Sequence, residues 1–290
     1  MADTCQGAVD TGFASLGYAK VAFLGVVQGI TELLPISSTA HMRIVPAVLG
    51  WPDPGAAFSA AMQLAALLAV VSYFRRDLIA LVGGSWRAVR LRQFGDRHLR
   101  LLIWIAVATV PIAVAGLLLA PTLNACGSPL RGIPAIGVAC VIMGLLLAVA
   151  ELRAGHRRNV ENATAMDAVL VGLAQVGTLI PGVSRSGSTL TAALGLGFRR
   201  EEAARFSFLL GVPAIALAGL KELWELHKVH LDSHGWSVLG VGIGVGALSA
   251  LVAIWGLMRL MERFSTWPFV IYRVALGAAL LSGAALGLLK

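Results

Sequence analysis

Residues 28–41, QGITELLPISSTAH, interrupt an apolar segment of about 18–49 with a proline and a cluster of hydroxyl side chains. A second apolar segment, about 168–198, is interrupted in a similar way by PGVSRSGST at 181–189. Proline and glycine end helices, and non-helical backbone is tolerated inside a membrane only where protein or water lines it. The sequence therefore predicts two broken or re-entrant helices with polar turns.

The rest of the chain is strongly apolar. Of its 290 residues 58% are hydrophobic and 13% charged, and the mean hydropathy of +0.82 excludes an ordinary soluble domain. A transmembrane helix needs about 20 apolar residues. We therefore predict an all-α polytopic membrane protein in which residues 1–290 form one integral membrane domain. Six transmembrane helices, besides the two hairpins, are expected at about 57–74, 101–120, 133–152, 206–222, 236–258 and 267–289.

The positive charge lies in the loops between these stretches. The net charge is +8, and the loop from Arg75 to Arg100 holds seven arginines. Arginine-rich loops stay on the cytoplasmic side, so the charge indicates orientation and not a nucleic-acid partner. Counting spans from this loop places both termini on the outer side of the membrane. The N-terminus lacks a basic region, which predicts no cleavable signal peptide.

Three cysteines, Cys5, Cys126 and Cys140, are scattered through the chain. Their spacing does not match a zinc or redox motif. We expect a structural role for all three.

The two interrupted segments resemble each other at a constant offset of 147 residues, which predicts an internal repeat with units of about 18–152 and 168–289. Each segment is followed by three spans, and an odd number of spans inverts the second copy. The hairpins should then enter from opposite sides and meet near the midplane. The matched pairs are Gly25/Gly172, Gln28/Gln175, Thr31/Thr178, Ser37/Ser184 and Thr39/Ser186.

The first hairpin combines a carboxylate with hydroxyls and an imidazole. Gln28 and Glu32 lie one helical turn apart, and an intramembrane carboxylate needs a metal ion, a cation or water. Ser37, Ser38 and Thr39 are natural caps of a restarted helix, whose free N–H groups bind phosphate. His41 lies one turn beyond Ser38, so the two are candidates for a nucleophile and its base. A histidine that is simply hydrogen-bonded in the interior is the alternative.

The second hairpin carries Arg185 among hydroxyls and glycines in an otherwise uncharged stretch. A guanidinium binds phosphate oxygens as a fork. Ser184, Ser186 and Thr189 offer further donors, so all four are candidate phosphate-binding residues. The alternative is an ion pair between Arg185 and Glu32 that joins the hairpins without chemistry. Together the hairpins hold a set suited to phosphoryl transfer, with a metal ion on Glu32 as the missing positive charge.

Both motifs resemble those of the undecaprenyl-diphosphate phosphatase family, bacterial membrane enzymes associated with bacitracin resistance. Residues 28–41 are similar to the family's (E/Q)xxxE motif with its following Ser-Ser and His, and residues 181–189 to its PGxSRSxxT motif. The resemblance covers essentially the whole chain. It implies release of the terminal phosphate from undecaprenyl diphosphate at a site facing the periplasm, with Mg²⁺ or Ca²⁺. The product would be recycled as a carrier of cell-wall precursors.

Carried over by position, Glu32 is the metal or acid–base carboxylate, Ser38 and His41 the nucleophile and base in either order, and Arg185 the phosphate clamp. Gln28 stands where many relatives carry glutamate. Its amide oxygen can ligate a hard cation without adding negative charge, so it is a weaker candidate metal ligand.

Two rival functions remain open at this stage. Inverted repeats with hairpins at the midplane are common in transporters and would suit a lipid flippase. The other membrane lipid-phosphatase superfamily carries a PSGH motif, which this sequence lacks. A transporter has no need of a serine and histidine beside an arginine clamp, and this favours the enzyme. A purely structural protein does not explain polar groups at both helix breaks.

Overall fold

The computed structural model describes residues 11–123, 129–287 and 289. Cys5 and Cys126 lie outside them, while Cys140 is buried and reduced. Helices account for all six predicted spans, so the polytopic all-helical fold is confirmed. They are α3 (Ala56–Tyr73), α5 (Arg97–Leu123), α6 (Ile133–Arg153), α9 (Arg200–Lys228), α10 (Ser233–Arg263) and α11 (Trp267–Ala285).

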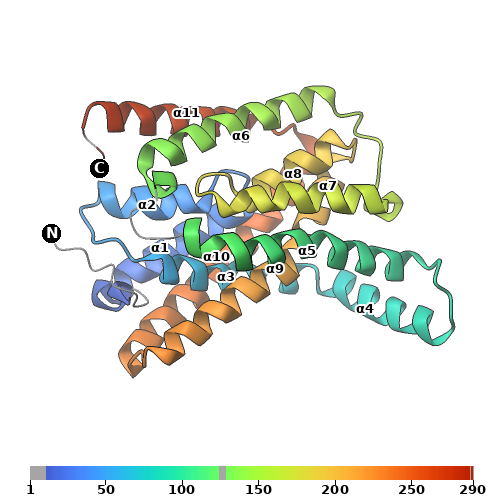
Figure 1. Cartoon of the computed structure of the whole chain (residues 1–290), viewed down its shortest axis with the longest axis horizontal. Helices are drawn as coiled ribbons and strands as arrows, with labels where there is room; N and C mark the ends of the chain where they lie inside the picture. Colours follow the sequence, from blue (N-terminus) through green and yellow to red (C-terminus); the bar gives the residue numbers. More distant parts are fainter. Residues whose placement is uncertain (1–10, 124–128, 288, 290) are drawn as a thin grey trace.

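Both predicted breaks are present. The first separates α1 (Gly17–Leu33) from α2 (Ser38–Val48), and the second separates α7 (Ala165–Val176) from α8 (Arg185–Gly195). Figure 1 shows α1 and α2 at one end of the molecule and α7 and α8 reaching in from the other end. Short 3₁₀ turns precede or follow these helices, at Gly12–Leu16, Pro129–Arg131, Val160–Asn162 and Gly177–Leu179.

Two details of the span pattern differ from the sequence prediction. The first 3₁₀ turn and α1 together, Gly12–Leu33, are long and apolar enough to cross a membrane alone, although we expected only half of a hairpin there. The segment expected as a loop after α3 instead forms helix α4 (Arg75–Arg90), bent by 74° from α3. With five charged residues in α4, hydropathy alone does not reveal it.

The two breaks are built alike. Ser37 and Ser184 have positive φ angles, 73° and 70°, and each side chain accepts a hydrogen bond from the backbone N–H three residues on. Left-handed backbone is uncommon for residues other than glycine, and a helix N-cap of this kind restarts the helix after the break. The 147-residue offset thus falls on residues with the same local structure. Symmetry of the complete repeat units stays a prediction.

Glycines let the helices around the hairpins approach closely. A Cβ added at Gly25 of α1 would lie 2.6 Å from the carbonyl oxygen of Gly242 on α10. At the equivalent Gly172 of α7, it would lie 2.6 Å from the carbonyl oxygen of Ala108 on α5. Backbone contact at such small residues is typical of packed membrane helices. It fixes α1 and α7 against the long helices that flank the site.

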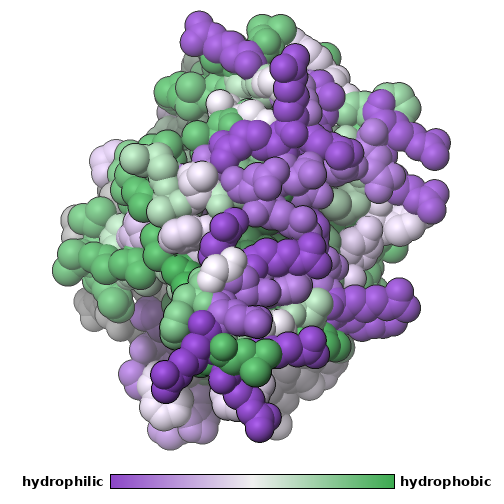
Figure 2. Space-filling model, turned by 90° about the vertical axis from the view of Figure 1, so that its right-hand side faces the viewer, coloured by the Kyte–Doolittle hydropathy of each residue, from purple (hydrophilic) through white to green (hydrophobic). Residues whose placement is uncertain are grey.

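The basic segments gather at one end of the molecule. Arg205 contacts Asp77, Arg200 contacts Glu151, and Arg97 pairs with Glu161 at 3.2 Å. Figure 2 shows the hydrophilic surface that these segments form, viewed from that end. The end of α11 and the first 3₁₀ turn lie at the opposite end (Figure 1). The loops predicted to share one side of the membrane therefore do share one end.

Candidate active site

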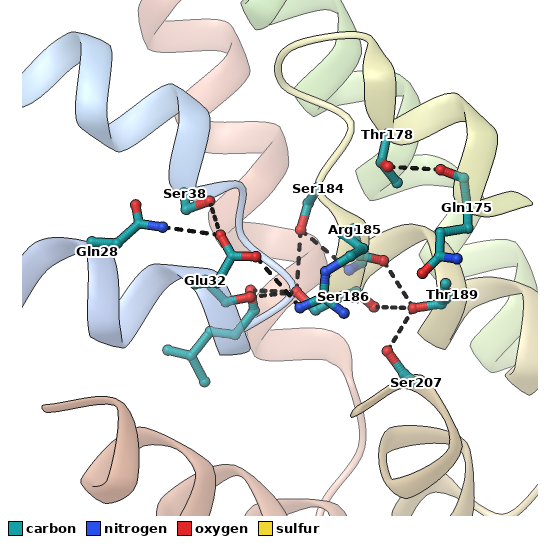
Figure 3. Close-up of polar contacts among 12 residues, drawn as sticks. Gln28, Glu32, Ser38, Gln175, Thr178, Ser184, Arg185, Ser186, Thr189 and Ser207 are labelled. Atoms are coloured by element: carbon teal, nitrogen blue, oxygen red, sulfur yellow. Dashed lines mark hydrogen bonds and ion pairs between the residues drawn. The ribbon is translucent and has the colours of Figure 1, made fainter. Parts of the chain in front are cut away.

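Glu32 stands at the centre of a hydrogen-bond cluster where the two breaks meet (Figure 3). It lies in the last turn of α1, with a side chain only 4% exposed. Its Oε2 atom accepts hydrogen bonds from Ser38 Oγ at 2.6 Å and from Gln28 Nε2 at 3.2 Å. Its Oε1 atom lies 3.4 Å from Nη2 of Arg185. A buried carboxylate requires such partners, because burying an unpaired charge is energetically costly.

Arg185 is the first residue of α8 and reaches Glu32 from the second hairpin (Figure 3). Its Nε and Nη1 atoms make no hydrogen bond with any residue in the described part of the chain. The guanidinium rests on α9 at Gly211, where an added Cβ would lie 2.0 Å from Nη1. The arginine is therefore held in place but keeps donors for an anion. The ion pair between the hairpins, which was the alternative interpretation of Arg185, does form, and it uses only the Nη2 atom of the guanidinium.

The other predicted hydroxyls mainly support the backbone. Ser186 Oγ donates to the carbonyl oxygens of Glu32 and Leu34, at 3.0 and 3.1 Å, and thereby ties the second break to the first. Thr189 donates to the carbonyl of Arg185 at 2.8 Å and lies 2.5 Å from the Ser207 hydroxyl. Ser37 and Ser184 cap α2 and α8. Ser184 Oγ also lies 3.3 Å from Ser186 Oγ, and the Thr189 hydroxyl is fully engaged.

The structure does not bring the side chains of Ser38 and His41 together, and Thr39 does not join the site. Ser38 donates to Glu32, whereas His41 Nδ1 lies 2.7 Å from the Ser37 carbonyl and its Nε2 lies 2.6 Å from the Tyr272 hydroxyl. A carbonyl only accepts, so Nδ1 carries the proton and Nε2 accepts from the tyrosine. Thr39 has an exposed side chain between two buried neighbours. Consecutive residues of a helix point in different directions, so Thr39 cannot face the same side as Ser38.

Arg273 of α11 is a site residue that the sequence prediction missed. It is the largest fully buried side chain among the described residues, 1% exposed. Its guanidinium donates to the Pro35 carbonyl at 3.1 Å and to the Gly182 and Val183 carbonyls at 2.9 and 3.0 Å. These carbonyls belong to the two breaks. One arginine thus supplies the donors that the interrupted helices lack. A lone arginine inside the apolar stretch 267–289 was the available sign.

A hard cation has few protein ligands here. Among the described residues, no group of three or more His, Cys, Asp or Glu side chains is arranged to hold a metal ion. Gln28 and Glu32 nevertheless place an amide and a carboxylate together, both buried and one turn apart. Mg²⁺ is often held by one or two carboxylates while phosphate and water complete its shell. The donor set fits such a shared site but not an all-protein cage.

Comparison with known proteins agrees with this geometry. The model of the family described as bacitracin resistance protein BacA matches residues 21–279. The chain belongs to this family. The matched part of the chain contains both helix breaks, the Glu32 cluster and Arg273.

Curated relatives are similar over nearly their full length. The chain is 68% identical over 261 residues to undecaprenyl-diphosphatase 2 of Mesorhizobium japonicum, which covers 90% of this chain and 99% of the relative. It is 48% identical to undecaprenyl-diphosphatase of Gloeobacter violaceus, covering 94% of each chain. It is 45% identical to the Nostoc enzyme of the same name, covering 96% of this chain and 88% of the relative.

Proposed function

We propose that this BacA family member is an undecaprenyl-diphosphate phosphatase, which releases undecaprenyl phosphate and inorganic phosphate. One observation carries the proposal: Glu32 joins a hydroxyl of its own hairpin to an arginine of the other, and that arginine keeps free donors. The named activity of relatives up to 68% identical supports the same reaction.

The diphosphate would bind where the two restarted helices begin. Helices α2 and α8 point their N-termini at the meeting of the breaks, and the positive end of a helix dipole attracts phosphate. Arg185 would bind the terminal phosphate through Nε, which has no partner among the described residues, and through Nη2, which now contacts Glu32. Binding an anion there would also loosen the 3.4 Å contact between Arg185 and Glu32. The carboxylate would then be available as a base.

Ser38 is the hydroxyl best placed for attack. Its hydrogen bond of 2.6 Å to Glu32 provides the base, in place of the histidine that the sequence suggested. In the proposed step the Ser38 oxygen bonds to the terminal phosphorus and its proton passes to Glu32. The bond from that phosphorus to the bridging oxygen breaks, and undecaprenyl phosphate leaves with the electron pair. Water then cleaves the phosphoserine and releases inorganic phosphate.

A divalent cation, Mg²⁺ or Ca²⁺, would be held by Glu32, the Gln28 amide oxygen and the diphosphate itself. When bound, it would neutralise charge on the phosphate oxygens. Gln28 keeps Glu32 oriented in either case, because the amide lies 3.2 Å from the carboxylate.

The arginine-rich end would face the cytoplasm of a bacterium, in its inner membrane. Both chain termini would then lie outside, and the site would open toward the periplasmic face. The product would return to service as a carrier of cell-wall precursors.

Phosphate release from purified protein with a polyprenyl diphosphate and Mg²⁺ or Ca²⁺ tests the proposal. Wild type should turn over, while Arg185→Ala and Glu32→Ala should lose at least about a hundredfold in rate, as expected for a group acting on the transition state. A suitable control is Arg263→Ala, because that arginine is exposed at the basic end. A protein that moves the lipid between leaflets without releasing phosphate would be a transporter and would overturn the enzyme assignment.

Rapid quench with terminally labelled substrate tests the nucleophile. Label should appear on Ser38 within the first turnover and should be absent from Ser38→Ala. Normal turnover by Ser38→Ala would show that water attacks directly. Label on His41 would show that the histidine is the nucleophile.

A further inference from the structure

Helix α4 differs from the spanning helices because its apolar and charged residues lie on separate faces. Leu81, Ser85 and Ala88 are buried against the protein. Beside this buried face, α4 carries a stripe of exposed apolar residues spaced three and four residues apart. Within the stripe, Trp86 is 72% exposed and Ile79 is 71% exposed. The complete stripe is Ile79, Val82, Trp86 and Val89. Such spacing makes one continuous apolar strip along a helix.

Exposed arginines border this stripe. Arg76 and Arg87 lie about three turns apart and Arg90 one turn further, so they share an edge of the helix. None of the three side chains forms a hydrogen bond or ion pair with another residue in the described ranges. The acidic residue of α4, Asp77, is already paired with Arg205. The helix therefore presents uncompensated positive charge beside apolar surface.

An apolar groove lies on the inner side of the stripe. It has a volume of about 500 Å³ between α4, α5 and α9, and a hollow of about 470 Å³ continues it over Leu78 and Val82. Its one hydroxyl, on Thr109, is satisfied by the Ile105 carbonyl. The other lining residues include Leu78, Leu81, Leu102, Ala106, Val110 and Leu209. Such a groove suits a hydrocarbon chain and offers nothing to a polar ligand.

The active site lies on the other side of α9. Leu209, Val212 and Pro213 line the groove, whereas Gly211 of the same helix turn packs on the Arg185 guanidinium. A chain in the groove is therefore separated from the phosphate clamp by the helix itself. The groove instead meets α4 at Leu78, Leu81 and Val82, and the arginine edge of α4 lies across the apolar stripe from it. This placement argues against the tail of the substrate as the occupant.

We propose that the groove and the arginine edge form a binding site for an anionic phospholipid of the surrounding membrane. An acyl chain occupies the groove, and the headgroup phosphate binds Arg76, Arg87 and Arg90. Basic amphipathic helices with a tryptophan on the apolar side lie in the membrane interface and prefer anionic lipid. The 74° bend from α3 turns α4 away from the direction of that helix, as such a position requires.

Native mass spectrometry of the whole chain, released from micelles with equal phosphatidylglycerol and phosphatidylcholine, tests the site. Wild type should retain phosphatidylglycerol at least tenfold more often. The triple variant Arg76→Gln, Arg87→Gln and Arg90→Gln should lose that preference. The matched control variant replaces Arg153, Arg157 and Arg263 with glutamine, which removes equal charge from the same end. This control should keep the preference for phosphatidylglycerol. Ala106→Phe fills the groove without changing charge and should also lose the bound lipid.

Gel filtration and phosphate release show that each variant is folded, because none of these residues belongs to the active site. Equal lipid preference in the triple variant and wild type would overturn the proposal. Equal loss in the control would show that net charge and not the α4 edge selects the lipid. If Ala106→Phe lost bound polyprenyl phosphate but kept phosphatidylglycerol, the groove would belong to the substrate tail, which also overturns the proposal.

Discussion

Replacing Arg273 with methionine should separate the two helix breaks while leaving the rest of the bundle intact. The guanidinium makes three hydrogen bonds of 2.9 to 3.1 Å to carbonyls of both breaks. At about 1.5 kcal/mol for each bond to a charged group, their loss costs about 4 to 5 kcal/mol. Removing a buried cation that has no carboxylate partner among the described residues restores part of this. We expect a net loss of about 2 kcal/mol in unfolding free energy.

The effect on turnover should be larger than the effect on stability. Ser38 and Arg185 each begin the helix that follows a break, so a shift of either break moves the reacting groups apart. A misplacement of about 1 Å commonly costs about a hundredfold in rate. We therefore expect kcat for phosphate release to fall about a hundredfold in Arg273→Met. Arg273→Lys should recover little, because one ammonium replaces a fork that spans both breaks.

The assay pairs phosphate release in detergent with the thermal unfolding midpoint of the same preparation. Arg263→Met is the control, an exposed arginine near the start of α11. If Arg273→Met unfolded at a lower temperature but kept a normal kcat below that temperature, its role would be stability alone. Normal values for both quantities would refute the reasoning altogether.

Three further substitutions test individual contacts. Gly211→Ala places a methyl group 2.0 Å from Nη1 of Arg185 and should displace the guanidinium. The KM should therefore rise about tenfold or more, while the unfolding midpoint temperature changes little. An unchanged KM would mean that the guanidinium is free to move. In Gly25→Ala the added methyl group would lie 2.6 Å from a backbone carbonyl oxygen of α10, so the free energy of unfolding should fall by about 1–3 kcal/mol. An unchanged melting curve would contradict this packing. Gln28→Glu should keep turnover and lower the Mg²⁺ concentration for half-maximal rate, and a higher requirement would argue against a metal ligand at this position.

The spans and the breaks could be predicted because they depend on local properties. A long apolar run, or a proline and glycine inside one, is visible without knowledge of neighbours. Helix α4 was predicted as a loop because its arginines dominate its hydropathy. Its apolar residues Ile79, Val82 and Trp86 have helical spacing, which is the feature of the sequence that indicates a helix.

The partners of the site residues could be predicted only in part. An ion pair between Glu32 and Arg185 was the alternative interpretation, and the two side chains do meet, as lone intramembrane charges of opposite sign favour. The partner of Ser38 was not foreseen, because the chain reverses at Pro35 and brings the hydroxyl back onto Glu32, six residues earlier in the chain. His41 could not be assigned from spacing either, since its partner Tyr272 comes from the far end of the sequence.

The two hairpins share a backbone structure but carry opposite charges, Glu32 in the first and Arg185 in the second. Ser38 and Arg185 are equivalent positions, each the first residue of a helix restarted by a serine cap. Glu32 corresponds to the apolar Leu179, so the carboxylate occurs on one side only. A second carboxylate, at Leu179, would repel the diphosphate, and a second arginine, at Ser38, would remove the attacking hydroxyl. Hydrolysis between two similar hairpins therefore requires that these two positions differ, while the capping serines that hold them stay alike.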